Sequence, residues 1–187
     1  GLTPGSMPPY SHTIHDEGIV FDNFQIVDTN GFRAAALRTA LTSGPFKARN
    51  PDQNVADLRA QIAANEKGIR ELRTMIEHFG HDTVRAYMQH VRANAAASVR
   101  EVIDRIGDGE HALELDNGML IRVRVSVNHD KREVCVDFSG TSAQSDTNFN
   151  APIAVTRAAV LYVFRTLIAE RIPLNAGCME PIRLIIP

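Results

Sequence analysis

Tryptophan is absent from this sequence, cysteine is rare, and no stretch of apolar residues is long enough to cross a bilayer. A membrane-spanning helix needs about 20 predominantly apolar residues, so the sequence predicts no transmembrane segment. The first residues also lack the basic flank and apolar stretch of a secretion signal. The two cysteines, Cys135 and Cys178, are far apart and lack metal-ligand spacing, which favours two reduced thiols over a disulfide or a zinc site. We therefore expect a cytoplasmic protein.

An excess of charge of one sign is also missing. The 20 Lys and Arg residues nearly balance the 22 Asp and Glu residues, which gives no reason to expect nucleic acid or an anionic membrane as a partner. The sequence contains no GxxxxGK[ST] phosphate loop and no GxGxxG fingerprint, so nucleotide binding is expected outside this chain. GxSxG and HExxH are missing too, and the usual hydrolase motifs therefore give no support.

What the sequence does contain is enough apolar material for one core. Hydrophobic residues make up 44% of the 187 positions, which predicts a single domain spanning residues 1–187. The apolar run at 182–186 resembles a strand that needs a partner. We therefore expect these residues to be an internal fragment of a longer polypeptide.

The clearest pattern is helical. Asn50 and Pro51 suit the cap and first position of a helix, and Gln53 can complete a capping box. Asn65 falls on the apolar stripe that follows, where it either fixes the register with a partner helix or contacts a ligand, and we favour the register role. Gly80 ends the stripe and Asp82 is expected to cap a second helix, so the two predict a long helical hairpin. The first stripe has alternating three- and four-residue spacings and consists of Val55, Leu58, Ile62, Ile69, Leu72, Ile76 and Phe79.

After residue 111 the apolar period changes to two. Turn signals at 116–118 and 129–131 separate three alternating runs, which predicts a small antiparallel β-meander. A polar loop at 139–150 then precedes the apolar segment 153–168, which is typical of a buried helix. The expected fold class is α+β.

Polar residues near the N-terminus are the densest group of candidate ligands. Imidazole and carboxylate groups suit a divalent metal, with His12 and His15 as ligands, whereas Asp16 and Glu17 suit acid–base catalysis or substrate contact. The alternative for all four is a solvated loop.

Two later segments could also contribute to chemistry. The hydroxyl, amide and backbone N–H groups at 137–150 suit an anionic ligand, or else serve as turns and a helix cap. Cys178 is a candidate nucleophile if a neighbouring group lowers its pKa; without a histidine close in sequence, small-residue core packing is the alternative. The residues expected to bind substrate in the loop are Ser139, Thr141, Asn148 and Asn150.

Five ordered blocks of the sequence lie at residues 4–9, 57–65, 137–141, 150–156 and 172–178. Together they resemble hydantoinase B and the C-terminal half of 5-oxoprolinase. Ser6 lies in the first block and is a further candidate for substrate binding. The family's segment rich in His and Asp, which is associated with metal binding, is expected before Gly1, so the fragment alone should lack a complete active site.

The resemblance implies ATP-driven hydrolysis of 5-oxoproline to glutamate, or of hydantoin or N-methylhydantoin to the carbamoyl amino acid. It also implies that ATP is bound mainly by a hydantoinase A-type subunit or a fused N-terminal half, with a divalent metal as a further expectation. Two alternatives stay open. One is a subunit of an acetone- or acetophenone-type carboxylase, and the other is a non-catalytic module that docks the hydantoinase A half.

Overall fold

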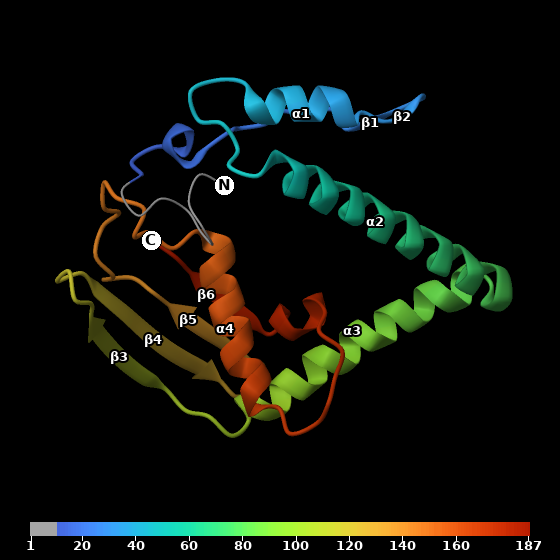
Figure 1. Ribbon diagram of the computed structural model, residues 1–187. Helices are drawn as coiled ribbons and strands as arrows, with labels where there is room; N and C mark the ends of the chain where they lie inside the picture. The colour runs from blue at the N-terminus through green and yellow to red at the C-terminus, as the bar shows by residue number, and fades with distance from the viewer. Residues whose placement is uncertain (1–10) are drawn as a thin grey trace. The chain divides into compact units, whose positions relative to one another are not determined.

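The computed structural model describes residues 11–187 (Figure 1). Its contacts divide the chain into two compact units. The first contains residues 11–78 and 145–150, and the second contains 79–144 and 151–187. Helices and mainly antiparallel strands occur together, which confirms the α+β class. The expectation of a single domain stays a prediction.

The first unit begins with short elements. A 3₁₀ turn, η1 (Ile14–Glu17), precedes a hairpin of two-residue strands, β1 (Val27–Asp28) and β2 (Gly31–Phe32). In the hairpin turn the Asp28 carboxylate accepts a hydrogen bond from the Asn30 N–H at 2.7 Å. Helix α1 (Ala34–Thr42) follows and buries Leu37 and Leu41.

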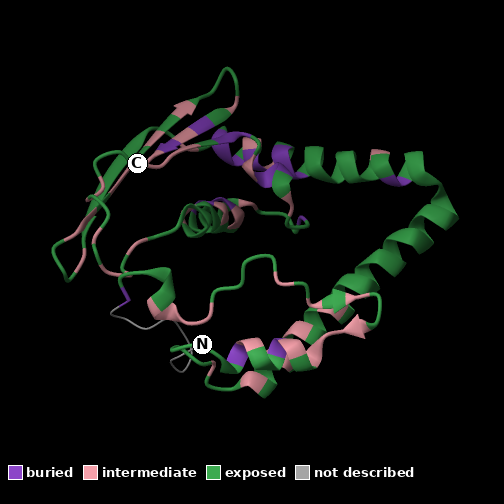
Figure 2. Ribbon diagram, turned by 90° about the horizontal axis from the view of Figure 1, so that it is seen from above, coloured by how far each residue is buried: buried purple, intermediate pink, exposed green. Residues whose placement is uncertain are grey.

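Helix α2 (Pro51–Phe79) begins where the sequence predicts. The Asn50 side chain accepts a hydrogen bond from the Gln53 N–H at 3.2 Å, which confirms Asn50 as a cap. The Gln53 side chain does not complete a capping box, because it donates to the Asp57 carboxylate at 2.7 Å one turn along the helix. At about 1.5 Å per residue α2 is about 43 Å long, and none of its side chains is buried within the described chain (Figure 2).

Helix α3 (His81–Ile103) opens the second unit and follows α2 after a break of one residue. Gly80 makes the break with φ of 82°, a conformation that suits glycine. Because the helix already begins at His81, Asp82 lies in its first turn and is not the cap that the sequence predicts. The C-terminal half of α3 supplies Ala95, Val99, Val102 and Ile103 to the core.

The predicted meander is confirmed and has one further strand. Strands β3 (Gly109–Glu114), β4 (Leu120–Asn128) and β5 (Glu133–Asp137) are antiparallel neighbours. Strand β6 (Ile182–Ile185) pairs in parallel with β5, placing Ile182 beside Val134. The apolar run near the end of the chain therefore has its partner within this unit.

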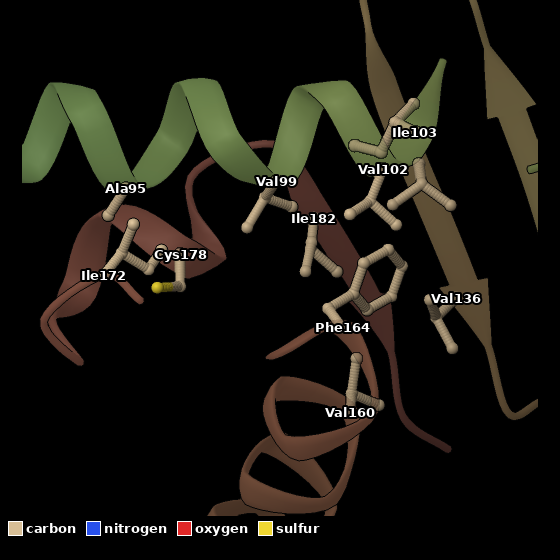
Figure 3. Close-up of a cluster of buried hydrophobic side chains, with 11 residues drawn as sticks. Ala95, Val99, Val102, Ile103, Val136, Val160, Phe164, Ile172, Cys178 and Ile182 are labelled. Carbon is tan, nitrogen blue, oxygen red and sulfur yellow. The ribbon is translucent and has the colours of Figure 1, made fainter. Parts of the chain in front are cut away.

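Helix α4 (Ile153–Leu167) and the 3₁₀ turn η2 (Ala176–Met179) complete the second unit. Val160 and Phe164 of α4 contact the core formed with α3, β5 and β6 (Figure 3). The helix was expected to be buried, but only one face is, since Tyr162 on the opposite face is 70% exposed and Val163 on the flank is 54% exposed. The core thus lies between the sheet, the end of α3 and one side of α4.

Candidate functional site

Asp16 is held by the turn that it helps to form. Its carboxylate accepts hydrogen bonds from the His12 N–H at 3.1 Å, the Thr13 N–H at 2.9 Å and the Thr13 hydroxyl at 3.0 Å. The backbone hydrogen bond from Thr13 is the largest cause that lowers the pKa of Asp16, because each donor stabilises the ionised form. Asp16 is therefore an ionised group at neutral pH that orders η1.

His12 joins this turn to the 145–150 loop of the same unit. Its ring Nδ1 bonds to the Asp146 carbonyl oxygen. A carbonyl can only accept, so Nδ1 carries the hydrogen and Nε2 bears the lone pair in the neutral ring. Two residues that are 134 positions apart in sequence thus meet here. His15 is exposed within η1.

Asn150 orders the loop around itself. Its amide donates to the Ser145 carbonyl at 3.0 Å and to the Thr147 carbonyl at 2.5 Å, and its oxygen accepts from the Ser145 N–H at 2.9 Å. Asn148 is partly buried in the same loop. The Asn150 amide is therefore used in holding the loop closed, while its predicted contact with substrate stays a prediction.

Glu17 lines a cavity of about 360 Å³ within the first unit. Small-molecule sites commonly occupy about 300–1,000 Å³ and combine an apolar wall with a few polar groups. This lining fits that description, because Phe21, Leu41 and Phe46 supply apolar surface. The polar side chains are Glu17, Lys47, Asn54, Asp57 and Gln61.

Lys47 and Asn54 also line the cavity but carry no motif, so the sequence did not predict them; Lys47 lies in the loop after α1 and Asn54 in the first turn of α2. Asp57 and Gln61 could have been found, because both lie in the 57–65 block on which the resemblance rests. One turn apart on α2, they share a face of the helix. The cavity therefore unites Glu17 with that block.

Thr141 lies in the second unit, where its hydroxyl forms hydrogen bonds with the backbone of strand β4. The oxygen donates to the Arg122 carbonyl and accepts from the Arg122 N–H, both at 3.1 Å. Ser142 repeats the arrangement, since its hydroxyl accepts from the Leu120 N–H at 2.8 Å. These residues extend the β4–β5 pairing through side chains.

Ser139 precedes them and is exposed. Its N–H donates to the Asp137 carboxylate at 2.8 Å, and hydrogen bonds from Ser139, the side-chain bond first, lower the pKa of Asp137. The Ser139 hydroxyl is thus beside an ionised carboxylate, whose pKa Arg124 and Arg183 lower further.

Cys178 is fully buried in η2 among aliphatic side chains (Figure 3). Ala95, Val99 and Ile172 belong to the same core cluster. This environment is typical of cysteine used as a small apolar residue, whereas a nucleophile needs access to substrate and a group that stabilises its thiolate.

The described residues do not form a metal site. Among residues 11–187 no three His, Cys, Asp or Glu side chains lie close enough together to hold a metal ion. His12 and His15 therefore stay predicted ligands. Ser6 lies outside the described residues. None of the helices over 11–187 combines the length and hydropathy that crossing a membrane requires.

Comparison with known proteins agrees with the resemblance in the five blocks. The Hydantoinase B/oxoprolinase profile matches residues 1–187. The chain belongs to the hydantoinase B/oxoprolinase family. This hydantoinase B-type chain is 37% identical over 196 residues to a 5-oxoprolinase from Dictyostelium discoideum and 38% identical over 212 residues to 5-oxoprolinase 1 of Arabidopsis thaliana.

Each alignment covers 100% of the chain but only 15% and 17% of those proteins, so the chain spans about a sixth of their length. A solved structure, the ATP-dependent caprolactamase from Pseudomonas jessenii, matches with a TM-score of 0.72 at 21% identity. It aligns with 100% of this chain and 32% of that one. The hydantoinase B-type fold is therefore shared with that protein.

Proposed function

We propose that the chain is part of an ATP-dependent enzyme that opens a small cyclic amide, with 5-oxoproline as substrate and glutamate as product. The observation that carries the proposal is similarity over the whole chain to two 5-oxoprolinases at 37% and 38% identity. The fold shared with an ATP-dependent caprolactamase supports a cyclic amide. Hydantoin and N-methylhydantoin are the next candidates.

ATP is needed because a lactam is a resonance-stabilised amide and a poor electrophile. Phosphoryl transfer from ATP to the carbonyl oxygen forms a bond between oxygen and phosphorus and releases ADP. Water then adds to the activated carbon, and the carbon–nitrogen bond breaks as nitrogen takes a proton, which leaves an acyl phosphate. A second water hydrolyses the acyl phosphate to the carboxylate of glutamate and free phosphate. Orientation of the ring and stabilisation of the developing charge supply the remaining catalysis.

We place the ring in the cavity lined by Glu17. Its carboxylate takes the proton of the lactam N–H as the carbonyl oxygen is phosphorylated, and later returns a proton to the leaving nitrogen. Lys47 pairs with the carboxylate of 5-oxoproline, a group that hydantoin lacks. The phosphoryl donor is bound mainly by a hydantoinase A-type half, fused or separate, which agrees with the missing phosphate loop.

The test uses the full-length polypeptide together with its hydantoinase A-type half. Phosphate release from ATP is followed with 5-oxoproline, hydantoin, N-methylhydantoin, or acetone plus bicarbonate. Release coupled to glutamate formation from 5-oxoproline is the expected result. Stimulation by hydantoin alone would make the enzyme a hydantoinase, stimulation by acetone plus bicarbonate would make it a carboxylase, and no stimulation would leave only a docking module.

Two variants test the cavity. Lys47→Gln should raise the KM for 5-oxoproline about tenfold, the loss of one charge-assisted contact, while leaving turnover of an uncharged lactam unchanged. Glu17→Gln should lower kcat for both substrates, by about a hundredfold or more. Lys67→Gln and Glu170→Gln, which change exposed residues outside the lining, are the matched controls. Equal effects of Lys47→Gln on charged and uncharged lactams would remove Lys47 from the proposal.

A further inference from the structure

The second half of α2 carries an apolar stripe that the described chain leaves exposed. Ile69, Leu72 and Ile76 are 42%, 42% and 36% exposed, and no α2 residue is buried within residues 11–187 (Figure 2). An amphipathic helix gains most of its stability from packing its apolar face. A stripe of this length therefore requires a partner surface.

The stripe is a heptad repeat. With Ile62, Ile69 and Ile76 at position a, the d positions hold Leu58, Asn65, Leu72 and Phe79. A strict seven-residue repeat is the pattern of a helix that packs along a second helix over several turns. Asn65 at a d position interrupts the apolar seam and lowers its stability.

The charges beside the stripe identify the partner helix. Position e holds Glu66 and, seven residues later, Arg73, both exposed. Neither side chain forms an ion pair with any residue over 11–187. In an antiparallel pair of identical helices, e positions flank e positions, so these two residues can complement each other across a two-fold axis.

We propose that α2 packs antiparallel against α2 of a second copy of this chain. The register places Ile69 level with Leu72 of the second copy and Asn65 level with its Ile76. Glu66 then flanks Arg73 of the second copy, and two-fold symmetry repeats the ion pair. The axis passes between Arg70 and Glu71, whose side chains point away from the seam.

Other pairings of two copies lose this complementarity. Shifting the antiparallel register by one heptad in either direction sets Glu66 against Glu66 or Arg73 against Arg73, and like charges repel. In a parallel pair, e positions flank g positions, so Glu66 meets Gln61 and Arg73 meets Gly68 without any ion pair. The chosen register also sets Gly68 opposite Met75, a small residue opposite a large one.

Cross-linking of the full-length protein tests the register. Asn65 and Ile76 are 11 residues apart, about 16 Å along one helix, so cysteines at both positions cannot join within one copy. The double variant Asn65→Cys/Ile76→Cys should give a covalent dimer under mild oxidation, and each single variant should not. Cross-linking by the single variants would establish a parallel pair and overturn the proposal.

A charge-swap cycle tests the partner independently. Glu66→Arg and Arg73→Glu should each weaken self-association about tenfold or more, measured by sedimentation equilibrium or light scattering. The double swap should restore it, because both ion pairs are reversed together. Unchanged self-association in all three variants would overturn the proposal. The proposal would also be overturned if the variants lost their association with the ATP-binding half while the two copies of this chain stayed associated. Circular dichroism of each variant verifies that α2 still folds.

Discussion

Gly177→Ala should destabilise the second unit more than any other glycine-to-alanine change in it. A Cβ built on Gly177 would lie 2.1 Å from the Arg92 carbonyl oxygen and 2.8 Å from the Asn175 Oδ1. Ordinary van der Waals contact begins at 3.4 Å, so the first distance falls more than 1 Å short. Both obstacles are held in place: Arg92 O belongs to the α3 backbone, and Asn175 Oδ1 accepts from the Gly177 N–H at 2.8 Å.

Relief of the clash requires η2 to move away from α3. That movement would loosen the packing of Cys178 on Ala95 and the hydrogen bond of 2.7 Å between Arg92 and Glu180. Overpacking of a core costs about 1–3 kcal/mol, and the loosened contacts put the expected loss near the upper end, about 3 kcal/mol. Local opening should therefore become about a hundredfold more frequent.

Hydrogen exchange followed by mass spectrometry measures this loss locally. Peptides from α3 and from 172–185 should exchange about a hundredfold faster in Gly177→Ala, provided exchange follows opening equilibria. Gly107→Ala is the matched control, because its Cβ meets nothing within 4 Å. Protection within about threefold of the unsubstituted protein, a change of under about 0.7 kcal/mol, would refute the close approach of η2 to α3.

Substitutions at three further sites test other features of the second unit. Cys178→Ser buries a hydroxyl without a partner and should lower the free energy of unfolding by about 1–3 kcal/mol. Cys178→Ala should retain turnover. Lost turnover in a stably folded Cys178→Ala variant would instead establish Cys178 as the predicted nucleophile. Thr141→Val should cost about 1–3 kcal/mol because Arg122 loses both backbone partners, with turnover unchanged. Hydrogen bonds from Arg132 are the largest cause that lowers the pKa of Asp104. The pair therefore stabilises the fold fully above the unfolded-state pKa of about 3.9, and this stabilisation is lost as the pH falls through the lowered pKa of the folded state. Asp104→Asn should therefore flatten the acid side of a stability–pH curve, and an unchanged curve would contradict the role of the pair.

Much of the secondary structure could be predicted because its causes are local. The Asn50 cap, the glycine break at Gly80 and the turn at 116–118 act within a few residues, and the structure has helices and strands at the predicted places. Cap geometry was less predictable. Gln53 and Asp82 each have a nearby alternative partner, Asp57 and His81, and sequence spacing does not rank such competing contacts.

The candidate site shows the same division. Sequence alone identified the family blocks, including the 57–65 segment of α2, and the missing phosphate loop. It also predicted Glu17 as an acid–base candidate, from the group of polar residues near the N-terminus. Tertiary structure decided which of these residues meet: His12 reaches Asp146, Glu17 shares a cavity with Lys47, and Cys178 enters the core. It also decided that the Thr141 hydroxyl forms hydrogen bonds with the backbone of β4. The reason is that a motif specifies which groups are present, whereas their partners depend on how segments distant in sequence pack together.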